Sequence, residues 1–187
     1  MLRPDYPIET DRLTLRPLAA TDEDAVHDLR SRPEVMRYLY GEPLSREQAR
    51  EFLLGRLDAT SIEKEGEGLV LAVVVRETDR LIGQVSLNYR SAEHRQGEVG
   101  FVFHPRAQGR GYATEAATAM LRLGFEGLGL HRVYGRCDDR NLKSAAVLER
   151  LGMRREAHIR ESELFKGEWG SELVYAMLAR EWEARCA

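Results

Sequence analysis

The spacing of hydrophobic and polar residues divides the chain into strand-like and helix-like stretches. Residues 12–18 and 131–137 alternate between the two kinds of side chain, a period of two that is typical of half-buried strands. Residues 69–75 form a continuous apolar run, and the turn signal Thr78-Asp79-Arg80 predicts a hairpin back through 81–88. The predicted strands cover residues 12–18, 69–75, 81–88, 98–103, 131–137, 154–162 and 172–178.

Apolar residues at helical spacing predict helices between these strands. Ser45 with Gln48 forms a capping box, which marks the start of a helix. The helices are expected from Thr21, as the cap, to about Arg30; from Ser45 to about Ile62; from the glycines at 109–111 to about 127; and from Asn141 to Gly152. Residues 89–96 are polar and predict an exposed turn. Consecutive strands followed by a strand-helix-strand-helix-strand tail indicate a mixed sheet with helices on both faces.

Length and composition narrow the class of protein. A chain of 187 residues suits a single domain over residues 1–187 with a sizeable core. The net charge of −3 gives no support for a nucleic-acid partner. No run approaches the roughly 18 apolar residues of a membrane span, and residues 1–10 lack the apolar core of a signal peptide. A cytoplasmic protein with no membrane partner is therefore expected.

The two cysteines, Cys137 and Cys186, lie far apart and form no metal-binding spacing. Neither a disulfide framework nor a metal site is expected. Cys137 closes a predicted buried strand, so it is interpreted as a small core residue and not as a nucleophile.

Candidate chemistry gathers at residues 106–115, where a strand ends and a long helix begins. Two glycines there allow a ligand to approach the backbone, because they carry no Cβ. The first turn of the helix has unpaired N–H groups at the positive end of its dipole, and together these features favour a phosphate. Arg106 and Arg110 add positive charge. Taken by itself, the segment is also compatible with glycines that serve only helix packing.

The spacing of this loop differs from that of other nucleotide loops. No Gly-Lys-Ser/Thr follows, as a P-loop requires, and Thr114 stands where a dinucleotide fingerprint needs its third glycine. What remains is Gln108-x-x-Gly111-x-Ala113. This pattern resembles the loop of the GNAT acyltransferases that holds the pyrophosphate of acetyl-CoA. The longer string Gly-Arg-Gly-Tyr-Ala-Thr-Glu-Ala resembles the RimJ/RimL branch, the protein N-terminal acetyltransferases and their relatives.

A second match lies at Asn141 and Ser144, three residues apart on the first turn of a predicted helix. In the GNAT enzymes the corresponding asparagine contacts the pantetheine arm, and the residue three positions later lies near the thioester sulfur. Plain helix capping by Asn141 would explain the helix end without this chemistry. The opening strand and the segment from Gly167 to Leu178 also resemble the RimJ/RimL branch, so the resemblance covers a core from about residue 8 to 182.

The resemblance implies the GNAT acyl-CoA N-acyltransferase fold. This is an α/β fold (α+β mixed), with a central mixed and partly splayed sheet of about six or seven strands and helices on both faces. Acetyl-CoA is the implied co-substrate, and no metal is implied. The residues implied to contact acetyl-CoA are Val102, Phe103, Gln108, Gly109, Arg110, Gly111, Tyr112, Ala113, Thr114 and Asn141.

The resemblance implies direct attack of an amine on the thioester, but two positions depart from the family's pattern. Leu148 stands where many GNAT enzymes carry a tyrosine that protonates the leaving thiolate, so Ser144 becomes the candidate acid, with a purely capping role as its alternative. Ser171 stands where RimJ/RimL-type proteins commonly carry an aspartate. Glu98 is the first candidate base and Glu161 the second, with a solvated strand residue as the commoner role for such a glutamate.

The sequence leaves open which amine accepts the acetyl group. The leading interpretation is an N-acetyltransferase acting on the N-terminal α-amine of a protein or peptide. The alternatives are a small-molecule amine acetyltransferase, for an amino acid, polyamine or antibiotic, and a non-catalytic acyl-CoA sensor. Tyr38, Tyr40 and the turn at 165–169 are candidate walls of the acceptor pocket, with core and edge packing as the alternative. A homodimer is compatible with this branch, and no segment predicts its interface.

Overall fold

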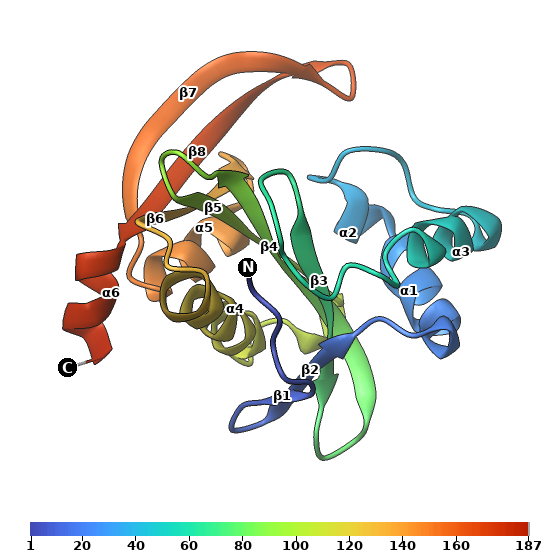
Figure 1. The fold of residues 1–187 in the computed structure, drawn as a ribbon. Coiled ribbons are helices and arrows are strands. Elements are labelled where there is room, and N and C mark those ends of the chain that lie inside the picture. The colour runs from blue at the N-terminus through green and yellow to red at the C-terminus, as the bar shows by residue number, and fades with distance from the viewer. Residues whose placement is uncertain (187) are drawn as a thin grey trace.

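A single eight-stranded sheet forms the centre of the computed structural model, which describes residues 1–186 (Figure 1). Its strand order is β1-β2-β3-β4-β5-β6-β8-β7. The strands are β1 (Ile8–Glu9), β2 (Leu13–Pro17), β3 (Gly68–Val75), β4 (Arg80–Ser91), β5 (Gln96–Phe103), β6 (Arg132–Asp138), β7 (Arg154–Phe165) and β8 (Glu168–Leu178). The predicted mixed sheet is confirmed, with eight strands in place of six or seven. The additional strand is the two-residue β1, which is too short to show an alternating pattern.

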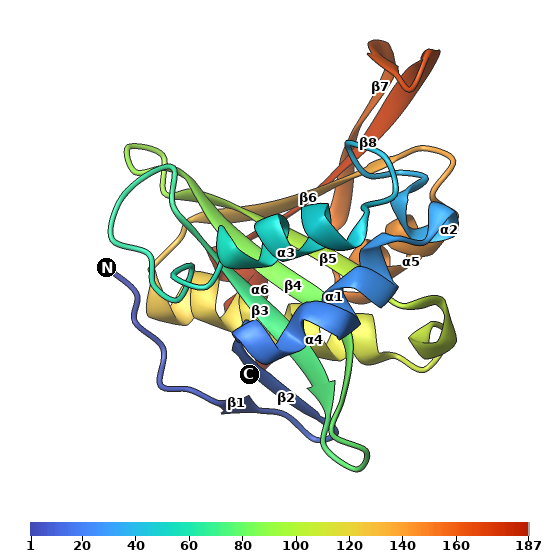
Figure 2. The ribbon, with the colours of Figure 1, turned by 90° about the vertical axis from the view of Figure 1, so that its right-hand side faces the viewer.

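Helices cover both faces of the sheet, as predicted (Figures 1 and 2). The helices are α1 (Glu23–Arg30), α2 (Pro33–Met36), α3 (Arg46–Leu54), α4 (Tyr112–Arg122), α5 (Leu142–Arg150) and α6 (Ala179–Cys186). The first three lie on one face, and α4 and α5 lie on the other. A π-helical segment (Leu123–Gly127) continues α4. No helix within residues 1–186 is long and apolar enough to cross a membrane.

The position of β3 between two hydrophobic cores explains why its sequence is continuously apolar. Leu71 and Val73 belong to the main core beneath α4 and α5, whereas Ala72 and Val74 belong to a smaller cluster beneath α1 and α3. Because successive side chains of a strand point to opposite faces, a central strand with a core on each side must be apolar at every position.

The sheet opens between β5 and β6, which are its only parallel neighbours in residues 1–186. They pair through Gln96↔Arg132, Gly97↔Val133 and Glu98↔Tyr134, and within residues 1–186 no further pair follows. Strand β5 continues to Phe103 beside β4, and β6 continues to Asp138 beside β8. The backbone of β5 beyond Glu98 therefore has no strand partner on the β6 side, which leaves polar groups for a ligand at the carboxyl end of this pair.

Two helix boundaries differ from the prediction. The helix that begins at the confirmed Ser45–Gln48 capping box ends at Leu54, not near Ile62. Ile62 is instead buried in an isolated bridge with Leu2, whose N–H donates to the Ile62 carbonyl (2.7 Å). This pairing spans 60 residues, so a local pattern could not show it.

Thr21 does not cap α1, contrary to expectation, because it lies inside a short 3₁₀ turn (Ala20–Asp22). Asp22 is the residue with the structural role there. Its carboxylate accepts from the backbone N–H of Ala19 (2.8 Å) and pairs with Arg16 (2.7 Å). Burial acts to raise the pKa of Asp22, but these hydrogen bonds outweigh burial and hold it below its ordinary value.

The hairpins are longer than predicted. Strand β4 runs to Ser91 and β5 begins at Gln96, so the exposed turn expected over 89–96 shrinks to residues 92–95. Strands β7 and β8 also exceed their predicted lengths, and their hairpin projects from the body of the molecule (Figure 2). Most side chains of β7 are exposed, so the distal part of the hairpin lacks the apolar alternation that marks a strand.

Candidate active site

The glycine-rich segment between β5 and α4 forms an open turn. Gly109 and Gly111 have φ of +76° and +79°, a left-handed conformation that suits glycine. A Cβ added to Gly109 would meet no atom within 4 Å, and one added to Gly111 would meet only Arg12 Nη2, at 3.4 Å. Close packing therefore does not explain either glycine. The turn conformation does, and the space above the backbone stays open.

Contacts from the segment before β2 hold the first turn of α4. Glu115 accepts from Thr10 Oγ1 (2.6 Å), from the Arg12 backbone N–H (2.8 Å) and from Arg12 Nε (2.8 Å). Burial acts to raise the pKa of Glu115, but these hydrogen bonds keep it below its ordinary value. Arg12 Nη1 also donates to the carbonyl of Arg110 (2.9 Å). One guanidinium therefore fixes the turn and offsets the acidic residue that would repel an anion there.

The start of α5 lies beside the glycine turn. Lys143 Nζ donates to Gln108 Oε1 (2.8 Å), and Arg150 Nε donates to Thr114 Oγ1 (3.4 Å). The structure thus brings together the two segments that the sequence analysis selected separately.

Asn141 and Ser144 have different roles at the start of α5. The Oδ1 of Asn141 accepts from the Ser144 backbone N–H (3.2 Å), so Asn141 supplies the cap. Within residues 1–186 the Ser144 hydroxyl has no hydrogen-bond partner and takes no part in capping. Leu148, one turn later, is 1% exposed and packs against Gly135 of β6.

Val102 and Phe103 end β5 where it has already separated from β6. The Val102 side chain lines a cavity on the face covered by α1–α3, whereas Phe103 is buried in the main core. Their side chains therefore point to opposite faces of the sheet. The backbone is what this edge can offer to a ligand in the opening itself.

A cavity of about 220 Å³ at the opening between β5 and β6 is rich in carboxyl groups. We call it the acidic cavity. The charged residues in its wall are Glu98, Asp138, Glu163, Glu172 and Arg136. Arg90 and Arg140 pair with Glu98 and Asp138 from outside this wall, so Glu163 and Glu172 are the carboxyl groups that favour a positively charged ligand.

Two of these carboxyl groups are in contrasting environments. Glu98, the predicted base, is bound by two guanidiniums: Arg90 Nη2 lies 2.7 Å from its Oε2, and Arg136 Nε lies 3.1 Å from its Oε1. Burial raises the pKa of Glu172; Arg136 opposes this shift, and the nearby Glu163 and Glu98 charges add to it. Glu172 is therefore the carboxyl group here whose environment favours holding a proton.

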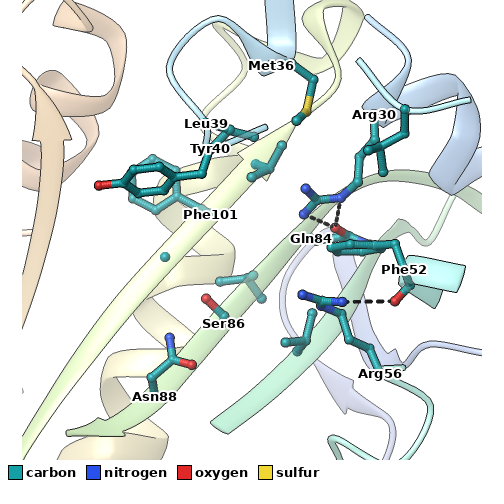
Figure 3. A pocket seen from close by; sticks show the side chains of 15 residues that line it. Arg30, Met36, Leu39, Tyr40, Phe52, Arg56, Gln84, Ser86, Asn88 and Phe101 are labelled. Carbon is teal, nitrogen blue, oxygen red and sulfur yellow. Dashed lines mark hydrogen bonds between the residues drawn. The ribbon is translucent and has the colours of Figure 1, made fainter. Parts of the chain in front are cut away.

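A second cavity, of about 440 Å³, lies between the sheet and the α1–α3 layer (Figure 3). We call it the arginine cavity, because Arg30 and Arg56 are the charged residues in its wall. The ring of Phe52 lies between their guanidiniums, at 3.8 Å from Arg30 Cζ and 3.6 Å from Arg56 Cζ. Leu39 and Tyr40 line both cavities and form their common wall.

Some of the aromatic residues proposed as walls of the acceptor pocket line a cavity, and one does not. Tyr38, Tyr40 and Phe165 line the acidic cavity. Tyr40 donates to Glu163 Oε2 (2.8 Å), and its ring meets Phe165 edge-on at 5.5 Å. Trp169 is mostly exposed and does not line either cavity.

Three further residues, His104, Ser171 and Cys137, have surroundings that indicate a structural role. His104 Nδ1 accepts from the Arg106 backbone N–H (3.1 Å), so this ring shapes the turn after β5. Ser171 accepts from the N–H of Glu161 (3.0 Å), whose side chain is exposed on the protruding hairpin. Burial raises the pKa of the Cys137 thiol to about 11, which disfavours the thiolate that a nucleophile needs.

The sequence analysis missed the arginine cavity. One signal was present: Gln84, Ser86 and Asn88 alternate with apolar residues along β4, so three polar side chains share one face of a central strand. A polar face in the middle of a sheet indicates a cavity or site, because buried polar groups need partners. The two arginines gave no such signal, since they lie on different segments, far from β4 in the sequence.

Comparison with known proteins gives a consistent result. Residues 12–154 match the family model described as acetyltransferase (GNAT) domain. The uncharacterized N-acetyltransferase YnaD of Bacillus subtilis (strain 168) is 35% identical over 94% of this chain and 98% of its own length. Spermidine N(1)-acetyltransferase of Escherichia coli (strain K12) is 28% identical over 91% of this chain and 88% of its own length.

Two solved structures share the fold. A GNAT-family acetyltransferase from Bacillus anthracis superposes with a TM-score of 0.84 at 32% identity, covering 93% of this chain and 99% of that one. A Vibrio cholerae protein assigned as a ribosomal-protein-serine acetyltransferase gives 0.77 at 28% identity, covering 95% and 99%.

Proposed function

The chain belongs to the acetyltransferase (GNAT) domain family, and on this premise we propose that it transfers an acetyl group from acetyl-CoA to a primary amine by direct attack in a ternary complex. The observation that carries the proposal is the open turn at Gly109 and Gly111, beside the gap between β5 and β6. We take residues 1–187 as one domain, since the main core draws on residues from Leu2 to Trp182.

In this proposal the glycine turn and the first turn of α4, residues 108–114, hold the pyrophosphate through backbone N–H groups. The free edge of β5 at Val102 and Phe103 offers backbone groups to the pantetheine and the thioester carbonyl. Asn141 contacts the pantetheine with the amide group that its capping role leaves free. Ser144 lies near the sulfur and, as the carbon–sulfur bond breaks, either donates a hydrogen bond to the thiolate or passes it a proton that the hydroxyl regains from solvent.

The nitrogen loses one proton to solvent after it forms the new carbon–nitrogen bond, but it must be neutral to attack, so an amine that arrives protonated must first give up a proton. Glu98 is our first candidate for receiving that proton, through water, because it stands where β5 and β6 part. Its carboxylate is held in place by Arg90 and Arg136. Glu172 shares the cavity and is the alternative acceptor of the proton.

Glu98→Gln is expected to lower kcat/KM for a peptide α-amine about tenfold at pH 7, and by less at pH 9. The reason is that an α-amine, with a pKa of about 7.7–8.0, becomes neutral without help at the higher pH. Steady-state rates across this pH range measure the effect, with Glu172→Gln as the parallel variant. A loss in Glu98→Gln that is equal at both pH values would assign Glu98 a structural role.

For the acceptor, we favour the N-terminal α-amine of a protein or peptide, as in the RimJ/RimL branch. An α-amine is partly neutral at physiological pH, so it needs less help from a base than a lysine amine does. The likeness to the Vibrio cholerae protein assigned as a ribosomal-protein-serine acetyltransferase supports this choice.

A second acceptor class is a small cationic amine. The carboxyl groups of the acidic cavity favour it, because they would attract a polyamine or other multiply charged amine. The similarity to Escherichia coli spermidine N(1)-acetyltransferase points the same way.

Release of free CoA thiol, with mass spectrometry of the product, tests the two acceptors. A short peptide beginning with Ser or Ala is compared with spermidine under equal acetyl-CoA. We expect kcat/KM for the peptide to be at least about tenfold higher. The reverse order would favour the small cationic amine, and no thiol release with any amine would contradict the proposed acetyl transfer.

A further inference from the structure

The two guanidiniums of the arginine cavity lack the carboxylate partners that buried arginines usually have. Arg30 Nε and Nη2 donate to Gln84 Oε1 at 3.1 and 2.8 Å, and Arg56 Nη1 donates to the carbonyl of Phe52 at 3.0 Å. Within residues 1–186 neither arginine takes part in an ion pair. Each keeps N–H groups that these contacts do not use, because a guanidinium has five donors.

Gln84 adds a further unused donor. Its side chain is 3% exposed, and its Oε1 must face Arg30, because a guanidinium can only donate. The Nε2 group is therefore left over, and it is buried without a partner. Such a group is costly to leave unpaired. The groups that Arg30, Arg56 and Gln84 leave free are all donors, and Ser86 and Asn88 on the same face of β4 can each donate as well as accept, so the ligand that fits must supply acceptors.

The charge of the cavity leads to the same conclusion. Burial lowers the pKa of Arg30 to about 10, and the Arg56 charge nearby adds to the shift. Burial also lowers the pKa of Arg56. Both groups still carry a charge at neutral pH, and they repel each other without a carboxylate in the wall to offset them. An anion in the cavity beside both guanidiniums would relieve the repulsion and replace the lost hydration.

The two cavities are opposite in charge and adjoin at Leu39 and Tyr40. An ammonium group is disfavoured beside Arg30 and Arg56 and is favoured in the acidic cavity. A ligand that spans the common wall can therefore satisfy both cavities only if it carries an amine at one end and an anion at the other.

We propose that the arginine cavity binds an oxyanion, a carboxylate or a phosphate, carried by the same acceptor whose amine enters the acidic cavity. This inference rests on the proposed acetyl transfer and narrows its acceptor to amines that bear an oxyanion. Arg30, Arg56 and Gln84 Nε2 provide the donors, and Phe52 holds the two guanidiniums apart and in position. Such a site selects against acceptors that carry only positive charge, including polyamines.

Three matched acceptors test the proposal: alanyl-glycine, with a free carboxylate; alanyl-phosphoserine amide, with a phosphate; and alanyl-glycine amide, with neither. We expect kcat/KM to be at least about tenfold higher for one or both anionic probes than for the amide. The better of the two identifies the source of the oxyanion. In Arg56→Gln the preference should fall to about one. Arg50→Gln, the same change on the exposed side of α3, should keep it.

Gln84→Glu is a second variant of nearly the same shape, in which the new carboxylate occupies Arg30 and removes the free Nε2 donor. The preference for anionic probes should be lost in this variant too. It therefore tests the oxyanion site even if Arg56→Gln fails to fold. Equal kcat/KM for all three probes in the native enzyme, or an unchanged preference in either variant, would overturn the proposal.

Binding without turnover separates this inference from the proposed function. Calorimetry measures the affinity of alanyl-glycine for the native protein and for Arg56→Gln, each with CoA present. Acetylation of all probes at equal efficiency would leave the acetyl transfer standing and remove the oxyanion site. Loss of alanyl-glycine affinity in Arg56→Gln, without thiol release by the native enzyme, would support the site and contradict the transfer.

Discussion

Gly111→Asp is expected to weaken acetyl-CoA binding by at least about a hundredfold, which corresponds to about 2.7 kcal/mol. Gly111 is the residue before the first turn of α4, and the space beyond its Cα is open except for Arg12 Nη2. A carboxylate at this position would accept from the N–H groups that the phosphate needs, as aspartate does at many helix starts. It would also repel the phosphate directly.

The fold should survive this change, because an aspartate cap stabilises a helix and aspartate tolerates the left-handed conformation better than most residues. Gly111→Asn has the same shape without the charge and should lose less affinity. Gly129→Asp is the matched control, since Gly129 has φ of +67°, has no atom within 4 Å of an added Cβ, and lies beyond the other end of the same helical segment.

Thermal denaturation with acetyl-CoA, CoA and ATP provides the measurement. The native protein should gain about 2.7 kcal/mol at a ligand concentration about 100 times the dissociation constant, for both CoA species and not for ATP. Gly129→Asp should retain this gain, and Gly111→Asp should lose it. An unchanged gain in Gly111→Asp would remove the glycine turn from the binding site.

The elements of this fold were predictable wherever a local pattern encodes them. The capping box at Ser45 and the cap at Asn141 satisfy N–H groups within their own first turns, so three or four residues suffice to reveal them. The end of α3 was not predictable in this way. Leu57 continues an apolar helical stripe, but Ile62 is held by Leu2, and such a partner is invisible to a window of a dozen residues.

The same distinction applies to the site. The glycine turn was predicted because its chemistry lies in consecutive residues. The contacts that hold it, from Arg12 to Glu115, join positions 103 residues apart and appear only in the folded chain. The arginine cavity is harder to predict, because Arg30 and Arg56 indicate a binding site only through their lack of carboxylate partners in the folded chain. A sequence can show that an arginine is present, but not that its charge is left unpaired.

Ser144→Ala is expected to lower kcat about a hundredfold and to leave the KM for acetyl-CoA nearly unchanged. The departing thiolate must be stabilised or protonated, and Leu148, buried against Gly135, has no group that could do so. The Ser144 hydroxyl is the unpaired polar group on this turn of α5, within residues 1–186. Stopped-flow measurement of thiol release under saturating acetyl-CoA reports the step in which the proton is transferred.

If Ser144 served only as a cap, Ser144→Ala would lower stability and leave kcat unchanged. The structure distinguishes the two roles, because the cap uses the backbone N–H of Ser144 and not its hydroxyl. The cap is the bond from the Ser144 backbone N–H to Asn141 Oδ1, which Ser144→Ala retains, so the melting temperature should not fall. Asn141→Ala removes the cap itself and should lower stability by about 1 kcal/mol. Ser144→Thr keeps a hydroxyl and should recover part of the lost rate. Full activity in Ser144→Ala would mean that water or the free edge of β5 stabilises the thiolate, and that the family's acid has no counterpart on α5 of this chain.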